Sequence, residues 1–483
     1  MKHKKTHLKY VCFLLLSFCC LQTSLFAQTI GGVYIDSQGM LRETKHIVDD
    51  SILMQLQKNF ANQTAPQDIA RPSRLRKISL SRLEALIKKA TQEGDVLPPE
   101  VKYLAGMIRV ESVFFYPDKN DVVIAGPAEG WKQLRSGEVV GVQSNRPVLH
   151  LDDLLVALRY AFAKQQSAPF IGCSIEPTKE GLKRYAASMK KLRGQIDSSY
   201  LPQILKQLQQ SMGPQDVKLY GIPKSSHFAL TMLVADYRMK RISLAHDPSP
   251  SQKVVSYLDL ATSRLQPGAR SPFQYRFWFL AKYNAIYHTK ERTAFQFSGQ
   301  GVQLMTARQG EGAPNQPAKT KKTKGKKAKG KKAKGKKAKG KKKRRKKVSK
   351  SARQFTRAFT KNFPEMAARV PVFAEMQNCI ALTVVAQLMR EEATTHQRWK
   401  PSFLLDKKKY AIEKFEVPRN VPSLLNDRKH YRQYMIGVSG GVKIKPEDLI
   451  AKTLQKQTKN RRLINRWKKS QQTIKKQTNW WWD

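Results

Sequence analysis

The alternation of hydrophobic and polar residues predicts short, paired strands along much of the chain. Residues 31–43 give two strands around a turn at residues 36–39, and residues 107–125 give a hairpin around a turn at residues 116–121. Further strand patterns predict a three-stranded meander at residues 276–280, 294–298 and 302–305, a hairpin at residues 434–445 that turns at residues 439–441, and single strands at residues 170–175 and 217–221. The strands are therefore expected to be short and mostly antiparallel.

Apolar residues at helical spacing predict several amphipathic helices among these strands. Ser81 and Glu84 form a capping box before the first helix, two acidic residues open the second, and Pro446 opens the last. The helices are expected at residues 83–87, 151–162, 179–192, 201–212, 355–390 (with a second, more buried part from Pro371) and from 446 onward. The predicted fold is mixed α/β (α+β), with short antiparallel hairpins, a meander and several amphipathic helices.

The first 27 residues have the composition of a secretory signal peptide. Residues 1–10 carry four lysines, residues 11–21 are apolar, and a short polar stretch leads to Ala27, after which cleavage is expected. After residue 27 no uninterrupted apolar stretch approaches the roughly 18 residues of a membrane span, which excludes a multi-pass membrane protein. We therefore expect an exported protein, located in the periplasm, in the cell envelope or outside the cell.

The composition changes sharply after residue 309. Residues 310–317 resemble a linker, and residues 319–347 hold 20 Lys or Arg in 29 positions, built on a KGKKA repeat. This lysine tract is expected to be a disordered insertion, because it has no apolar residue larger than Ala, its charges repel one another and its glycines disfavour helix. The chain then divides into a signal peptide (1–27), an N-terminal hairpin and helical region (28–100), the first part of an α/β domain (101–309), the Lys-rich insertion (310–351), the second part of the domain (352–445), and a basic C-terminal helix with a Trp-rich tail (446–483).

The chain carries a formal net charge of +54, from 90 basic and 36 acidic residues. Basic character extends beyond the lysine tract, because 70 basic residues remain against the 36 acidic ones without it. Dense lysine without interleaved aromatic residues neutralises polyanions by counterion release and reads no sequence, so a non-specific contact with acidic polysaccharide, lipopolysaccharide or nucleic acid is expected. The alternative is a solvated spacer. The candidate contacts are Lys326, Lys327, Lys331, Lys332, Lys336, Lys337, Lys341, Lys342, Arg344 and Arg345.

Only two of the five cysteines lie outside the predicted signal peptide. These are Cys173 and Cys379, and both stand in apolar segments. One interpretation is a pair of buried, inert thiols, because free cysteine behaves as a small hydrophobic residue. The other is a disulfide between them, formed if export delivers the chain to an oxidising compartment.

Several segments resemble an uncharacterised family of exported planctomycete proteins, defined as a domain of unknown function. The similar segments are AGPAEGW at 125–131, LDDLLVALR at 151–159, ADYRMKRI at 235–242, PVFAEMQNCIALTVVAQL at 371–388 and VSGGV at 438–442. The resemblance covers most of residues 100–445 and makes the lysine tract an insertion within one domain. It implies export and a mixed α/β domain, and it implies no activity.

Three motifs match catalytic or phosphate-binding patterns without their context. Residues 437–441 fit G-x-S-x-G, but a strand rather than a helix is expected after the serine, and no histidine follows it. Ser188 and Lys191 fit S-x-x-K, but the partner motifs S-D-N and K-T-G are absent. Residues 325–331 approach a phosphate-binding loop, but they lack the final Ser or Thr and a flanking strand. We interpret them as a hairpin turn, a solvated helix face and low-complexity sequence.

No local pattern indicates a metal or cofactor. The nine histidines are scattered without H-x-H or H-E-x-x-H spacing. Asp152 and Asp153 are adjacent at a helix start, where the helix dipole favours acidic residues. Asp236, Arg238 and Lys240 are interpreted as a structural ion-pair network, with a polar pocket as the alternative.

The C-terminal residues 459–483 combine basic residues with tryptophan. Tryptophan favours membrane–water interfaces, and a basic helix with spaced apolar residues can lie on an anionic bilayer, so a peripheral membrane contact is one interpretation. A frayed, solvated C-terminus is the other, because Ser470 and Gln471 interrupt the apolar stripe. The candidate membrane contacts are Trp467, Trp480, Trp481 and Trp482.

These observations support one main functional hypothesis and two rivals. The main hypothesis is an exported, non-enzymatic binding or structural protein whose cationic loop contacts polyanions. The first rival is an envelope enzyme whose site is assembled from residues distant in sequence, and convergent residues with a shifted titratable group would favour it. The second is a histone-tail-like, non-specific DNA binder. The sequence predicts no catalytic residue and no oligomeric state.

Overall fold

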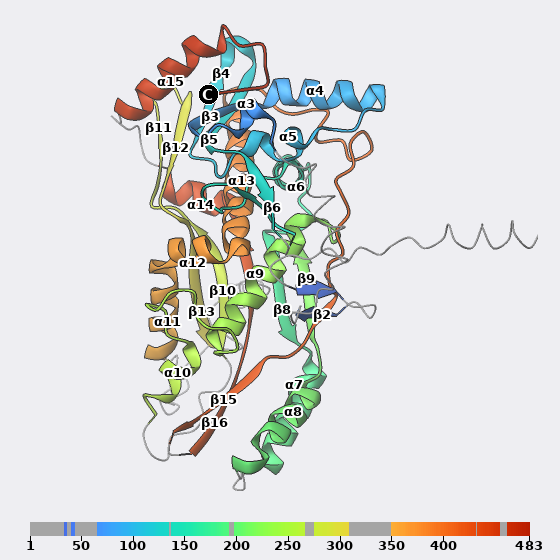
Figure 1. Cartoon of the computed structure of the whole chain (residues 1–483), viewed down its shortest axis with the longest axis vertical. Helices are drawn as coiled ribbons and strands as arrows, with labels where there is room; N and C mark the ends of the chain where they lie inside the picture. Colours follow the sequence, from blue (N-terminus) through green and yellow to red (C-terminus); the bar gives the residue numbers. More distant parts are fainter. Residues whose placement is uncertain are drawn as a thin grey trace, which may run out of the picture.

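A computed structural model describes residues 33–35, 40–43, 65–134, 137–192, 198–265, 275–308, 349–430, 432–454 and 461–483 of the chain. The predicted mixed α/β class is confirmed. Two large, mainly antiparallel sheets are stacked along the long axis of the molecule, and helices cover them (Figure 1). Both predicted hairpins in the first 130 residues are confirmed, and so are the predicted helices near residues 151, 179, 201 and 446.

The larger sheet has seven strands and occupies the lower half of Figure 1. Its order is β13-β10-β16-β8-β9-β14, with β15 paired to β16; β10 and β16 run parallel, and the other neighbours are antiparallel. The strands are β8 (Ile171–Pro177), β9 (Gln215–Tyr220), β10 (Tyr275–Lys282), β13 (Gly301–Arg308), β14 (Asn420–Val421), β15 (Leu425–His430) and β16 (Arg432–Ile444).

The second sheet has six antiparallel strands in the order β11-β12-β4-β5-β3-β17, so that β17, at residues 481–482, pairs with β3, at residues 73–79. Two further strand pairs, β1–β2 and β6–β7, form separate two-stranded sheets. The bounds are β1 (Val33–Ile35), β2 (Leu41–Glu43), β3 (Ser73–Ser79), β4 (Ser112–Tyr116), β5 (Asp121–Ala128), β6 (Trp131–Gln133), β7 (Val139–Gly141), β11 (Ala285–His288), β12 (Ala294–Ser298) and β17 (Trp481–Trp482).

Helices pack on both sheets, and a long helix, α13, runs between them (Figure 1). They are α3 (Gln67–Ala70), α4 (Leu80–Glu93), α5 (Pro99–Lys102), α6 (Leu151–Ala161), α7 (Lys179–Lys191), α8 (Leu201–Met212), α9 (His227–Ser243), α10 (Tyr257–Thr262), α11 (Lys350–Lys361), α12 (Phe363–Arg369), α13 (Pro371–Thr395), α14 (Pro446–Thr453) and α15 (Arg461–Ile474). As predicted, Pro371 begins the most buried of the helices that follow the lysine tract.

Helix α13 connects two hydrophobic cores. Its first half, through Ile380, packs with α9 and the larger sheet, and its second half, from Leu382, packs with α6 and the second sheet. By length and composition α13 is the one described helix that would suffice to cross a membrane, but 94% of its apolar window is buried inside the protein. Its apolar residues are therefore used in packing the two cores together.

The predicted three-stranded meander is wrong. Strands β10 and β13 pair with each other, but β12 belongs to the second sheet, where it pairs with β11 and β4. An additional strand, β11, lies between β10 and β12 in sequence and carries the chain from one sheet to the other. The local alternation identified strands correctly, but their partners come from distant segments.

The predicted hairpin turn at residues 439–441 is also wrong, because β16 continues straight through it. Gly440 and Gly441 lie between β10 and β8, and a β-carbon would come within 1.5 Å of Phe277 O and 2.1 Å of Cys173 O, respectively. These glycines therefore permit a close approach of three strands. Ser439 is buried within this strand.

The first long helix is capped two residues earlier than predicted. The Ser79 hydroxyl, rather than that of Ser81, accepts from Arg82 N. Glu84 does not complete a capping box, because its Oε1 accepts from Ser402 N (2.7 Å) and Leu404 N (3.0 Å) of a distant loop. The carboxylate is used for tertiary contact instead.

The lysine tract lies outside the described residues, but the residues that flank it meet at Tyr275. Arg308, the last residue of β13, is paired with Tyr275 in the sheet, and Ser349 N donates to the Tyr275 hydroxyl (3.2 Å). Both attachment points of residues 309–348 are thus held by one residue of β10. This arrangement is compatible with an insertion between two adjacent points of a folded domain.

Candidate functional site

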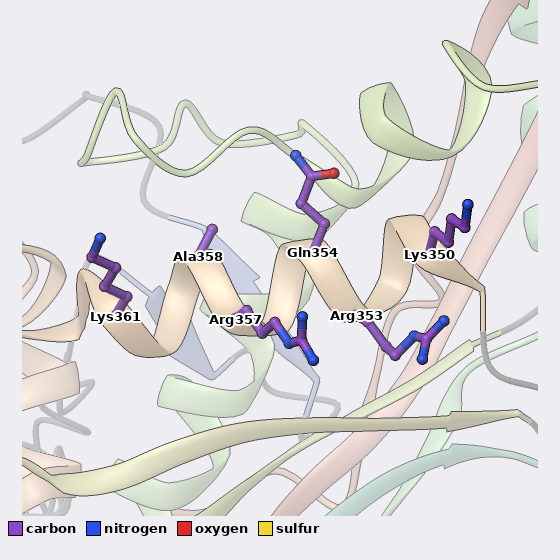
Figure 2. A pocket seen from close by; sticks show the side chains of 6 residues that line it. All are labelled: Lys350, Arg353, Gln354, Arg357, Ala358 and Lys361. Atoms are coloured by element: carbon purple, nitrogen blue, oxygen red, sulfur yellow. The ribbon is translucent and has the colours of Figure 1, made fainter.

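Helix α11 presents a cationic face directly after the lysine tract (Figure 2). A surface groove of about 520 Å³ runs along it and is lined by Lys350, Arg353, Gln354, Arg357, Ala358 and Lys361. The four basic residues are three or four positions apart, which places them on one side of a helix. All four are exposed.

The opposite side of α11 fixes the helix to the larger sheet. Phe355 and Phe359 are fully buried, and the Phe355 ring contacts Phe277 of β10 edge to face at 5.2 Å between ring centroids. The Ser351 hydroxyl donates to Leu260 O (2.6 Å), and the Thr360 hydroxyl accepts from Leu304 N (2.9 Å). The cationic residues are therefore held on a rigid element rather than on a flexible loop.

The charge of this face is uncompensated. None of its four basic side chains forms an ion pair within the described part of the chain, and the lining contains no acidic residue. Another cation, Arg264, donates a hydrogen bond to Gln354 of the groove. Lys350 and Arg353 also lie in the first turn of α11, where the positive end of the helix dipole adds to their potential. The site is suited to bind anions electrostatically.

A second candidate is a buried polar cluster where α6, α9 and α13 meet. His227 Nδ1 donates to Asp153 Oδ2 (2.9 Å), and the Cys379 thiol donates to the same oxygen (3.6 Å). His150, which precedes α6, stacks on His227 with 4.2 Å between ring centroids. Glu375 of α13 is buried beside them, and its carboxyl oxygens accept no hydrogen bond from the described residues.

Burial and mutual charge shift the pKa values of this cluster in opposite directions. Burial raises the pKa of Glu375 to about 8; the charge of His227 opposes this shift, and those of Glu138 and Asp153 reinforce it. Burial alone would lower the pKa of His227, but the charge and hydrogen bond of Asp153 outweigh it and raise that pKa to about 9. Burial lowers the pKa of His150 to about 3. At neutral pH the cluster therefore holds an Asp153–His227 ion pair beside a protonated Glu375.

The geometry of the cluster does not activate Cys379. A catalytic cysteine needs a cation or a base beside its sulfur to form the thiolate. Here the carboxylate of Asp153 lies between the thiol and His227, and burial together with this negative charge raises the pKa of Cys379 well above its usual value. The convergent titratable groups are those that an enzyme would show, but Asp153, His227, Glu375 and Cys379 are all buried where three helices meet.

The predicted cluster of Asp236, Arg238 and Lys240 is divided between two sites. Asp236 and Lys240 form a fully buried ion pair (2.7 Å), in which burial raises the pKa of Asp236 and Lys240 opposes the shift. Arg238 instead pairs with Asp247 (2.9 Å), which also binds Arg241. The structure therefore has ion pairs at these residues, as the structural interpretation supposes, but not one shared network.

The two cysteines are free and buried, in agreement with the inert-thiol interpretation and not with a disulfide. Cys173 lies in β8, where burial raises the pKa of its thiol. Cys379 lies in α13 and contacts Asp153. The Asp152 carboxylate accepts a hydrogen bond from Glu413 N (2.8 Å), whereas that of its neighbour Asp153 binds His227.

The four tryptophans predicted to contact a membrane are buried or half-buried in the protein. Trp480 is only 9% exposed and Trp482 4%, while Trp481 and Trp467 are half-buried. Strand β17 pairs with β3, so the tail is docked rather than frayed. A membrane contact through Trp480 or Trp482 would require the tail to leave the sheet.

The comparison with known families is informative for one part of the chain. A family model described as a protein of unknown function, DUF1598, matches residues 173–257. This segment is similar to an uncharacterised domain family. It runs from Cys173 in β8 through α7, α8, β9 and α9 to the start of α10, so it contains His227 and the Asp236–Lys240 pair but not α11. No curated protein and no solved structure matches the chain.

Sequence reasoning missed both candidate sites. The α11 face had a readable signal, namely basic residues at helical spacing opposite Phe355 and Phe359, but the neighbouring lysine tract dominated the local composition. The buried cluster had no such signal, because Asp153, His227 and Glu375 are far apart in the sequence. The ten tract residues proposed to contact polyanions lie outside the described residues.

Proposed function

We propose that this protein is an exported, non-enzymatic binding protein of the cell envelope that holds anionic polymers. The cationic face of α11 is the folded part of the contact, and the lysine tract that precedes it supplies further charge. The ligand is recognised by its charge density, as acidic polysaccharide, lipopolysaccharide phosphates or nucleic acid would be, without readout of a sequence.

The observation that carries this proposal is the uncompensated charge of α11. Four exposed cations share one face of the helix, and no described acidic side chain pairs with them. Surface cations of folded proteins commonly have acidic neighbours, and a groove lined by one sign of charge attracts ions of the other sign. A further 20 Lys and Arg lie at residues 319–347, just before this helix in sequence. The lysine tract and α11 therefore attract the same class of ligand.

The proposed location rests on the sequence. The Lys-rich start, the apolar run and Ala27 support export, and so does the resemblance to exported planctomycete proteins. The enzyme rival is less well supported, because the buried cluster lacks an activated nucleophile. A nucleoid protein is less well supported, because it would have no use for a signal peptide.

Neutralising the α11 face is expected to weaken binding to heparin, a soluble polyanion. The variant Lys350→Gln, Arg353→Gln, Arg357→Gln, Lys361→Gln should bind at least about tenfold more weakly at 0.1 M NaCl, because fewer counterions are released. Isothermal titration calorimetry of the full chain measures this loss.

The matched control removes four exposed lysines of α7, with Lys179→Gln, Lys183→Gln, Lys190→Gln, Lys191→Gln. It lowers the net charge by the same amount, so it is expected to reduce heparin affinity by less than about threefold if the contact is local. Equal losses in the two variants would show that only net charge matters and would refute a site on α11.

A further inference from the structure

Helix α15 has a buried face and an exposed face, with half-buried residues between them, of which Arg466 pairs with Glu111 (3.6 Å). Leu463, Ser470 and Ile474 face inward and are buried, with Trp467 packed beside them. Leu463, Ile474 and Trp467 belong to one hydrophobic cluster with Phe114, Val123 and Trp482 of the second sheet. The helix thus lies flat on the body of the protein at one end of the long axis (Figure 1).

The outer face of α15 and of the turn that follows it is entirely polar. Eight positions fall on this side by helical spacing, and all eight are exposed. Six are basic and two are amides, and the sequence contains no acidic residue between Asp448 and Asp483. The eight residues are Arg461, Arg462, Asn465, Lys468, Lys469, Gln472, Lys475 and Lys476.

The cations of this face also affect a lysine of the sheet below. Lys77 is 7% exposed, and burial lowers its pKa to about 8, with Asp483 opposing the shift and Lys469 adding to it. The Lys77 ammonium donates to Leu75 O (3.2 Å). An anionic layer over α15 would reduce the mutual repulsion of these cations.

We propose that the outer face of α15 docks the protein on an anionic lipid bilayer by electrostatic attraction alone. The row of cations extends over roughly 20 Å of a straight helix, which suits a flat charged surface. Clusters of four to eight Lys or Arg on an amphipathic helix are typical of binding to anionic lipid headgroups. The apolar side of α15 and Trp482 are used in the protein interior, so no residue of the face inserts into the bilayer.

This contact differs from the one first expected for the C-terminus. Insertion of tryptophan would leave binding that persists at high salt, because it is apolar. Electrostatic docking is screened and disappears as salt increases. The inference concerns a surface separate from α11 and does not depend on polymer binding there.

The test uses co-sedimentation with vesicles of phosphatidylcholine and phosphatidylglycerol, in the full chain. The α15 variant Lys468→Gln, Lys469→Gln, Lys475→Gln, Lys476→Gln is compared with the α11 and α7 variants, each of which removes four charges. The α15 variant should lose at least about tenfold in vesicle partitioning and less than about threefold in heparin affinity, whereas the α11 variant should show the reverse. Wild-type binding to vesicles should vanish at 0.5 M NaCl.

Three results would overturn the proposal. Equal vesicle partitioning of the α15 and α7 variants would mean that α15 is an ordinary solvated face. An equal loss of heparin and vesicle binding in the α15 variant would assign the face to polymers rather than to lipid. Vesicle binding by the wild type that persists at 0.5 M NaCl would show that apolar residues insert.

Thermal unfolding serves as the folding control. An unchanged unfolding temperature of the α15 variant confirms that the helix remains docked.

Discussion

Replacing Glu375 with glutamine is expected to stabilise the protein at pH 9 by on the order of 4 kcal/mol, and far less at pH 5. In the folded protein burial raises the pKa of this carboxyl to about 8, whereas in the unfolded chain it has its ordinary value near 4.5. The folded state therefore holds the proton more tightly, and folding becomes less favourable as the pH rises from about 4.5 to 8. Glutamine has nearly the same shape and does not ionise.

His227 adds to the same pH dependence. The ion pair with Asp153 raises its folded pKa to about 9, so its stabilising contribution is complete below about 6.5 and is lost as the pH rises through 9. Both groups make the wild type less stable at alkaline pH. Chemical denaturation between pH 5 and 10 should show a decline in the free energy of unfolding that is shallower in Glu375→Gln.

The matched control is Glu180→Gln, at an exposed position in the first turn of α7. It should change the free energy of unfolding by less than about 0.5 kcal/mol at every pH, as surface substitutions usually do. If Glu375→Gln and the control gave parallel curves with the wild type, Glu375 would be ionised in the folded protein at neutral pH, and the assigned charge state of the cluster would be wrong.

Replacing Trp482 with alanine is expected to destabilise the protein by about 3–5 kcal/mol, the usual cost of removing a buried aromatic side chain. Trp482 is 4% exposed and packs in the cluster that joins Phe114, Leu463 and Ile474. Its removal leaves a cavity between the second sheet and α15, and equilibrium unfolding in urea measures the loss.

Trp481→Ala is the control from the neighbouring position. Trp481 is half-buried, and its ring lies beside the guanidinium of Arg76, 4.7 Å from the ring centroid. Its loss should cost markedly less than that of Trp482. Equal and small costs for the two substitutions would show that β17 is not docked on β3 in solution.

Local sequence signals predicted those elements whose boundaries are set by local chemistry. Pro371 and Pro446 begin helices as expected, and the acidic pair Asp152 and Asp153 lies in the first turn of α6. Helix α9 was missed, because it is buried on nearly all sides and its apolar residues show little helical periodicity. Strand partners were missed where they are distant, as for β12 and β4.

The C-terminal segment shows how one polar residue can conceal a buried face. Ser470 interrupted the apolar stripe in the sequence, but in the structure it lies on the inner face of α15 and is fully buried. Tyr116 of β4 donates its hydroxyl hydrogen bond to the Ser470 hydroxyl (2.6 Å), so the serine needs no solvent. A contact across 354 positions of the chain cannot be deduced from helical spacing.

The candidate sites were predictable to different degrees. The expectation of a polyanion contact came from composition alone, and the structure adds a folded cationic surface at α11 that the composition did not locate. The buried cluster forms where three helices meet. The sequence around Asp153 or Glu375 does not indicate which residues will lie beside these carboxyl groups. Long-range packing decides which titratable groups become neighbours and so shift one another's pKa values.

The central claim is that the protein binds polyanions through charge and that α11 takes part. It is tested most directly by the salt dependence of affinity for a short DNA duplex, measured by fluorescence anisotropy from 0.05 to 0.3 M NaCl. The wild type should give a steep linear fall of log K with log salt, with a slope of about −0.9 for each phosphate neutralised. The α11 variant should flatten this slope by about 2 to 4, and the α7 variant by less than about 1. A shallow slope in the wild type, or the same slope in the wild type and the α11 variant, would contradict the claim.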